Sequence, residues 1–164
     1  MSTRTLVILR HAKAANPDGL PDVERPLTDR GHADAAVAGA WLIHSGLVPD
    51  LVLCSPARRT RQTWHGVAVA LSSEPTVRFE DQLYGAPVRT LLATVRTAGE
   101  NAATLLLIGH NPGLSELSAL LDPDGADTDG LRTAGIAVHT LTGAWTDDGN
   151  GTAPIAAAHT ARAD

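Results

Sequence analysis

Arginine and histidine side chains follow three apolar runs of the chain. Arg10 and His11 end the first run, two arginines within residues 55–59 follow the second, and His110 follows the third. If the runs are neighbouring parallel strands, these side chains converge at one edge of a sheet, where open α/β sheets bind their ligands. The planar guanidinium of arginine matches phosphate oxygens, and helix N-termini add unpaired N–H groups. The pattern therefore predicts an oxyanion site.

The elements that must position this site alternate between strand and helix patterns. Residues 6–9 are apolar without a polar alternation, which suits a strand buried on both faces. Further strands are expected over residues 51–53, 76–79, 104–108 and 135–141. The alternation predicts one α/β domain, a three-layer α/β/α sandwich around a mainly parallel mixed sheet.

Helix signals lie between these strands. Thr28 is a plausible N-cap and Gly46 a plausible stop, and Ser55 with Pro56 predicts a helix that runs to about Leu71. Asn111 and Pro112 cap a later helix. Trp41 and Trp64 are expected in the core. The apolar faces predicted for three helices are Ala33, Ala36, Val37, Ala40 and Trp41; Val88, Leu91, Leu92 and Val95; and Leu114, Leu117 and Leu121.

Composition limits the class of protein. A chain of 164 residues predicts a single domain over residues 1–164, in which the Gly-, Asp- and Ala-rich residues 146–164 form a loosely ordered tail. A net charge of −5 argues against a nucleic-acid partner. One cysteine, Cys54, excludes an intrachain disulfide, and no apolar run reaches the length of a membrane span. A cytoplasmic protein is the expectation.

Four motifs resemble those of the histidine phosphatase (phosphoglycerate mutase-like) superfamily, and most closely its short SixA-type branch of phosphohistidine phosphatases. The resemblance covers roughly residues 4–142, with the motifs in the family's order. They are Arg10-His11-Ala12, Leu27-Thr28-Asp29-Arg30-Gly31, the turn from Ser55 to Thr63 that contains Arg58, Arg59 and Gln62, and Gly109-His110-Asn111-Pro112.

The resemblance implies that His11 is the nucleophile and that Arg10, Arg59 and His110 bind the phosphoryl oxygens. Spacing from the motif's serine and glutamine favours Arg59 over its neighbour Arg58. A neutral imidazole can attack phosphorus when an acceptor holds its other N–H. Phosphoryl transfer then needs in-line positioning and charge stabilisation, and neither a metal nor another cofactor is expected.

No general acid stands at the family's usual positions. Asn111 follows His110 where the acid-phosphatase branch has an acidic residue, and Gly85 occupies the position of the mutase branch's glutamate. Glu80 and Asp81 are the fallback candidates, although exposed carboxylates before a turn are the commoner interpretation. A missing acid disfavours alkoxide leaving groups. It is tolerable for a phosphoramidate, whose imidazole leaves already protonated, so a phosphorylated protein histidine is the expected substrate.

Other interpretations stay open. They are a phosphatase of small phosphate esters and a non-catalytic phosphoprotein-binding module. A cysteine phosphatase is disfavoured because Thr60 stands where its loop needs arginine, and the seven histidines lack metal-ligand spacing. The short chain favours an open site, although the loop from Ala15 to Pro26 could act as a lid. Lys13, Arg25 and Arg30 are candidates to line the approach. The sequence does not define the oligomeric state.

Overall fold

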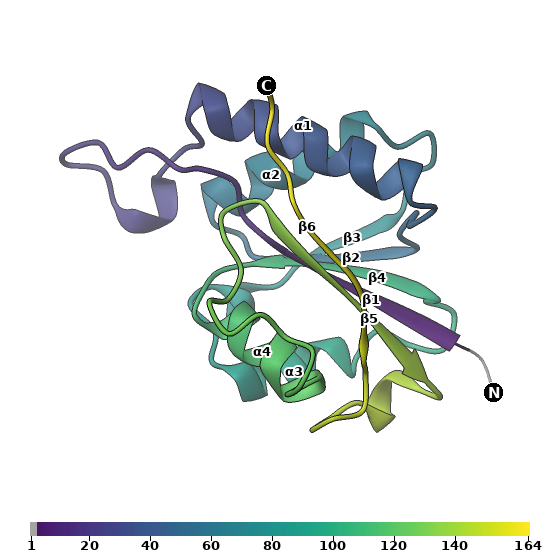
Figure 1. Ribbon diagram of the computed structural model, residues 1–164. Helices are drawn as coiled ribbons and strands as arrows, with labels where there is room; N and C mark the ends of the chain where they lie inside the picture. Colours follow the sequence, from purple (N-terminus) through teal and green to yellow (C-terminus); the bar gives the residue numbers. More distant parts are fainter. Residues whose placement is uncertain (1–2) are drawn as a thin grey trace.

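The computed structural model describes residues 3–164, which form three layers (Figure 1). A six-stranded sheet of order β3-β2-β4-β1-β5-β6 is the middle layer. Helices α1 and α2 cover one face of this sheet, and α3 and α4 cover the other. The predicted α/β sandwich is confirmed.

The elements alternate along the chain much as the sequence predicts. The strands are β1 (Thr3–Arg10), β2 (Leu51–Cys54), β3 (Thr76–Phe79), β4 (Thr104–Gly109), β5 (Gly135–Thr142) and β6 (Ile155–Thr160). The α-helices are α1 (Asp29–His44), α2 (Arg58–Val69), α3 (Val88–Val95) and α4 (Gly113–Leu121). Three short 3₁₀ helices are η1 (Asp22–Glu24), η2 (Asp81–Leu83) and η3 (Trp145–Asp147).

The strand register brings the polar strand ends together. The sheet contains four mutually parallel strands in the order β3-β2-β4-β1. Strand β5 pairs antiparallel with β1, and β6 pairs antiparallel with β5. Arg10 pairs with Gly109 across β1 and β4, and the His11 amide donates to the Gly109 carbonyl at 3.1 Å. The Ser55 amide donates to the Ile108 carbonyl at 3.1 Å. The residues that follow β1, β2 and β4 therefore meet at one edge.

Two hydrophobic cores hold the layers together. Alternate residues of a strand point to opposite faces, so Leu6 and Ile8 belong to the core under α3 and α4. Val7 and Leu9 belong to the core under α1 and α2. Because β1 is buried on both faces, it fixes the position of the residues at its C-terminal end relative to all four helices.

The predicted apolar face of α1 is wrong. Of the five residues that define it, three are exposed, and Val37 and Trp41 are only half-buried. The buried stripe consists of Gly31, Asp34, Ala35, Ala38, Gly39 and Leu42. A Cβ on Gly39 would lie 2.6 Å from the Val67 carbonyl oxygen, and one on Gly66 would lie 2.6 Å from the Ala35 Cβ. The two helices pack through small residues because their backbones approach so closely.

Two further predictions need correction. Helix α2 begins at Arg58 with Ala57 at its N-cap, whereas Ser55 was the predicted cap; the Ser55 hydroxyl instead binds a histidine of the site. Residues 146–164 are not a loose tail throughout, since Ile155–Thr160 hydrogen-bonds to β5 as an edge strand of the sheet.

The structure confirms other helix predictions: the N-cap Thr28, the stop at Gly46, the apolar faces of α3 and α4, and the burial of Trp64. Among residues 3–164, no helix is long and apolar enough to cross a membrane.

Candidate active site

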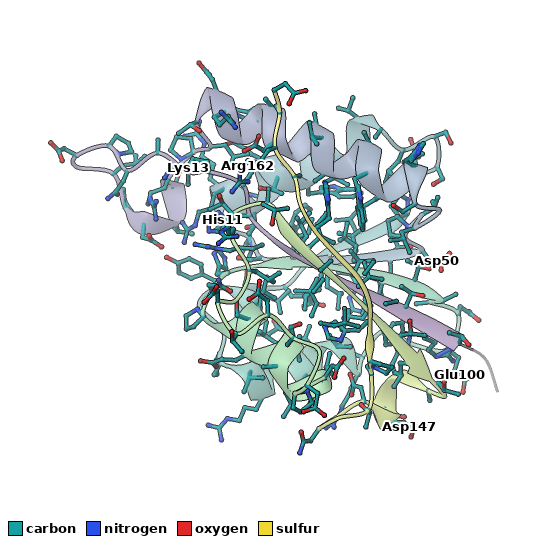
Figure 2. The ribbon with its side chains drawn as sticks, in the orientation of Figure 1. His11, Lys13, Asp50, Glu100, Asp147 and Arg162 are labelled. Carbon is teal, nitrogen blue, oxygen red and sulfur yellow. The ribbon has the colours of Figure 1, made fainter. Side chains whose placement is uncertain are left out.

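Four predicted site residues come together in one pocket at the C-terminal edge of the parallel strands. Arg10, His11, Arg59 and His110 line a pocket of about 280 Å³, and Figure 2 shows His11 at this end of the sheet. The ring centroids of the two histidines are 5.4 Å apart. The remaining lining residues are Lys13, Ala14, Arg25, Asn111 and Thr133. None of these lining side chains is a carboxylate.

The His11 ring is held in one tautomer. Its Nδ1–H donates to the Ala12 carbonyl at 2.8 Å, so the lone pair of the neutral ring lies on Nε2. Burial lowers the pKa of His11 to about 4, an effect that the charges of Arg59 and Arg10 reinforce and the Ala12 hydrogen bond opposes. At neutral pH the imidazole is therefore uncharged, as a nucleophile must be.

Helix α2 supports the backbone next to His11. The Ala12 amide donates to the Thr63 hydroxyl at 3.0 Å, and this hydroxyl donates to the Arg59 carbonyl at 2.7 Å. Gln62 accepts the Leu27 amide at 2.8 Å. Ala12 is completely buried, so the Cβ that replaces the family's glycine is accommodated.

The Leu-Thr-x-x-Gly motif packs against the same turn. The Thr28 amide donates to the Lys13 carbonyl at 2.9 Å, and the Thr28 hydroxyl accepts the Gly31 amide at 3.0 Å. A Cβ on Gly31 would lie 2.1 Å from the Lys13 carbonyl oxygen. Glycine at this position therefore lets the start of α1 contact the turn that follows His11.

His110 is oriented by Ser55. Its Nε2 lies 2.8 Å from the Ser55 hydroxyl oxygen, and its Nδ1 is buried without a hydrogen-bond partner among residues 3–164. Burial lowers the pKa of His110 to about 3, with contributions from the charges of Arg59 and His11. When the neutral ring accepts a hydrogen bond from the Ser55 hydroxyl at Nε2, its one N–H lies on Nδ1. This N–H can then donate to an anion.

Arg10 is attached to the loop before β5. Its Nη1 donates to the Leu131 carbonyl at 3.1 Å, and the Asn111 side-chain amide donates to the same carbonyl at 2.8 Å. The Ala134 amide lies 3.1 Å and 3.0 Å from the carbonyl oxygens of Arg10 and His11, respectively. Ala134 adopts a φ of 54°, a left-handed conformation that is uncommon for alanine. The loop thereby closes over the Arg-His dipeptide.

Arg59 is held by an acidic residue that the sequence analysis did not identify. Its Nη1 donates to the Asp22 carbonyl at 2.7 Å, and its Nη2 donates to the Asp22 carboxylate at 3.0 Å. The same carboxylate accepts a hydrogen bond from the Tyr84 hydroxyl and one from Arg25. Arg59 itself is buried, whereas its neighbour Arg58 is half-buried and does not line the pocket.

Asp22, Glu80 and Asp81 do not line the pocket. Hydrogen bonds, first from Tyr84 and then from Arg59 and Arg25, hold the pKa of Asp22 well below its usual range. Glu80 pairs with Arg78 at 2.7 Å, and neither Glu80 nor Asp81 lines the pocket.

Three buried side-chain nitrogens of the pocket residues have no hydrogen-bond partner within residues 3–164. They are Nε of Arg10, Nε of Arg59 and Nδ1 of His110. Buried polar atoms are normally paired, because an unpaired one costs about 1–3 kcal/mol. All three residues line the pocket, so an anion bound there is a candidate partner for these nitrogens.

Cysteine chemistry does not fit this site. Cys54 is completely buried, and burial raises the pKa of its thiol to about 12. Thiolate character, which a cysteine nucleophile requires, is therefore suppressed. In the described part of the chain, no three His, Cys, Asp or Glu side chains are grouped so that they could hold a metal ion.

Sequence reasoning missed Asp22, Tyr84 and the role of Ser55. Asp22 lies in a Pro-rich loop and Tyr84 follows a short 3₁₀ helix, so neither belongs to a strand end or an apolar stripe. Ser55 belongs to the Ser-Pro motif, and this position could have indicated a role in the site, whereas the sequence pattern favoured a helix cap. Lys13 and Arg25 do line the pocket.

Residues 6–86 match the family model of the histidine phosphatase superfamily (branch 1). The chain is 31% identical over 147 residues to phosphohistidine phosphatase SixA of Escherichia coli strain K12, and the match covers 88% of each protein. The structure of a protein described as a putative phosphohistidine phosphatase SixA, from Nakamurella multipartitia, is 33% identical with a TM-score of 0.86, and the match covers 99% of both chains. A protein histidine phosphatase SixA solved with tungstate is 26% identical, with a TM-score of 0.80 and coverage of 95% of this chain and 96% of that one.

The chain belongs to the histidine phosphatase superfamily, whose members are phosphatases with a histidine nucleophile. Within that class it is a member of the SixA-type branch.

Proposed function

We propose that this protein is a phosphohistidine phosphatase that acts on a phosphorylated histidine of another protein. The observation that supports this proposal is a pocket with three arginines, one lysine and two histidines but no carboxylate in its lining. An alkoxide leaving group needs a proton from an acid of suitable pKa. Asp22, which contacts the pocket's Arg59, is held deprotonated by its three donors. The site is therefore better suited to a leaving group that carries its own proton.

In the proposed first step, His11 Nε2 attacks the phosphorus of the substrate. A new N–P bond forms on His11 while the N–P bond of the substrate breaks. When the other ring nitrogen of the substrate phosphohistidine carries a proton, its imidazole leaves in the neutral form. Arg10, Arg59 and His110 stabilise the charge on the transferred oxygens, since all three line the pocket and each has a buried nitrogen without a partner in residues 3–164.

In the second step, water attacks the phosphorus on His11. The N–P bond breaks, its electron pair returns to Nε2, and the product leaves as dihydrogen phosphate, which carries both protons of the water. The hydrogen bond from Nδ1 to the Ala12 carbonyl keeps the ring in place through both steps. No residue is assigned to the general acid, and Glu80 and Asp81 are not supported by their positions.

The tungstate complex of a SixA structure is consistent with this interpretation, because tungstate is a tetrahedral oxyanion like phosphate. The name of the Escherichia coli relative points to the same substrate class. The proposal includes a reaction that needs no metal ion. Turnover of the phosphohistidine substrate should therefore be unchanged when EDTA is added.

The deciding experiment is a rapid alkaline quench during turnover of a phosphohistidine protein, followed by mass spectrometry of this chain. Phosphate on His11, stable in base and lost in acid, is the expected result. His11→Gln should abolish the adduct and turnover, while His44→Gln, which changes an exposed histidine at the end of α1, should leave both unchanged. Phosphate on Cys54, or faster cleavage of sugar phosphates than of phosphohistidine, would contradict the proposal.

A non-catalytic binding module makes a different prediction. Such a module would bind the phosphoprotein without turnover, and the His11→Gln variant would bind it equally well. The neutral His11 nucleophile and its fixed tautomer favour catalysis.

A further inference from the structure

A second pocket opens beside the phosphoryl pocket and shares Lys13 and Thr133 with it. Its volume is about 500 Å³. Its other lining residues are Thr28, Arg30, Asp34 and Arg162. Figure 2 shows Lys13 and Arg162 next to each other, directly beside His11. We call this second pocket the basic subsite.

Arg162 is positioned relative to the nucleophile by the backbone. Its Nη1 donates to the Thr133 carbonyl at 2.8 Å, and the Ala161 amide donates to the Ala134 carbonyl at 3.0 Å. The Ala134 amide in turn contacts the carbonyl oxygens of Arg10 and His11. The segment after β6 is thus attached to the same loop that closes over the catalytic dipeptide.

A buried carboxylate supports the two arginines of the basic subsite. Asp34 is 1% exposed and accepts hydrogen bonds from Arg30 Nε at 3.3 Å and from the Ala163 amide at 2.8 Å. Arg162 Nη1 lies 3.6 Å from its second oxygen. The side chains of Arg30 and Arg162 remain 60% and 39% exposed, so both can reach a ligand.

The basic subsite carries more positive charge than Asp34 neutralises. Lys13, Arg30 and Arg162 contribute three positive charges against one buried negative charge, although the whole chain has a net charge of −5. Within residues 3–164 the Lys13 ammonium makes neither a hydrogen bond nor an ion pair, while the Lys13 carbonyl is fixed by Thr28. By contrast, the acidic residues Asp50, Glu100 and Asp147 lie at the far end of the molecule (Figure 2).

We propose that the basic subsite binds a carboxylate of the substrate protein, from an acidic side chain near its phosphohistidine. This inference rests on the proposed phosphohistidine function. Positive charges beside a reaction pocket raise the encounter rate and the selectivity for an anionic partner. The phosphoryl pocket binds the group that is transferred, and the basic subsite selects which phosphohistidine is presented to it.

The test compares two phosphohistidine peptides that differ only in their flanking residues, glutamate in one and glutamine in the other. Phosphoramidate serves as a small substrate without flanks. The wild-type protein should hydrolyse the glutamate peptide with a kcat/KM about fivefold above that of the glutamine peptide, the size expected for exposed charge pairs. Added salt should reduce this preference because it screens the charges.

Variants separate charge from structure. Arg162→Gln and Arg30→Gln should each reduce the preference for the glutamate peptide, whereas Arg162→Lys should retain it because the charge remains. Arg89→Gln is the matched control, because it removes one positive charge from an exposed position of α3, on the other face of the sheet. It should leave the preference for the glutamate peptide intact. A purely structural role of Arg162 would instead change both peptides and phosphoramidate by the same factor.

The outcomes distinguish the two proposals. Equal hydrolysis of both peptides by the wild-type protein would overturn the basic subsite while leaving the proposed function in place. Hydrolysis of phosphoramidate but of neither peptide would overturn both. Faster turnover of a sugar bisphosphate than of either peptide would assign the second anion to a small molecule and overturn the carboxylate proposal.

Discussion

The Thr63 hydroxyl links the turn after His11 to helix α2. It accepts the Ala12 amide at 3.0 Å and donates to the Arg59 carbonyl at 2.7 Å, and the residue is completely buried. The Ala12 carbonyl is the acceptor that holds the His11 ring. Thr63 therefore fixes the peptide unit between His11 and Ala12, next to the carbonyl that holds the His11 ring.

Thr63→Val keeps the shape of the side chain and removes the hydroxyl. The buried Ala12 amide then has no acceptor, which costs about 1–3 kcal/mol. The methyl group that replaces the hydroxyl offsets at most about 0.8 kcal/mol of this loss. We expect a net decrease of roughly 1–2 kcal/mol in the free energy of unfolding, and a rate of His11 phosphorylation lowered about tenfold to a hundredfold because the ring is less well placed.

Urea unfolding measures the first quantity, and a quenched single-turnover reaction with a phosphohistidine peptide measures the second. Thr63→Ser is the matched control, because it retains the hydroxyl and loses only the methyl group. It should keep the phosphorylation rate close to that of the wild type even if its stability falls. A Thr63→Val protein with wild-type stability and rate would refute the reasoning.

Three other perturbations test the site. Because burial lowers the pKa of His11 to about 4, its ring should stay neutral as the pH falls from 7 to 5 and should protonate only below pH 5. An NMR titration of the side chain with a midpoint near pH 6.5 would contradict this. Gly31→Ala should lower the free energy of unfolding by about 1–3 kcal/mol, because the new Cβ clashes with the Lys13 carbonyl oxygen. This loss should outweigh the gain of about 1 kcal/mol in helix propensity. An unchanged urea unfolding curve would exclude the clash. Asp22→Asn removes the negative charge that pairs with Arg59. The affinity for inorganic phosphate, measured by calorimetry, should then rise about threefold. A lower affinity would mean that Asp22 acts mainly by orienting the Arg59 guanidinium.

The basic subsite combines residues of a family motif with a residue far outside the motifs. Arg30 lies within a motif, but Arg162 lies twenty residues beyond the end of the motif-bearing region, at roughly residue 142. It reaches the pocket because β6 adds to the sheet edge and returns the chain to the loop before β5.

Local sequence patterns were enough to predict which charged residues gather in the pocket. Arg10, His11 and His110 each follow an apolar run, and such runs form parallel strands whose ends meet at one edge. These are local signals, so strand positions and strand ends could be predicted. The spacing within the Ser-Pro motif likewise placed Arg59 in the pocket and Arg58 outside it.

Side chains from distant parts of the chain complete the site, and their meeting depends on the tertiary fold. Asp22 meets Arg59 and Tyr84 because two irregular segments fold against the start of α2, and irregular segments carry no periodic signal. The buried face of α1 follows from close backbone contact at Gly39 and Gly66, which an apolar pattern does not record. Edge strand β6 forms through backbone hydrogen bonds to β5, and these bonds depend on a neighbouring strand more than on the residues of β6 itself.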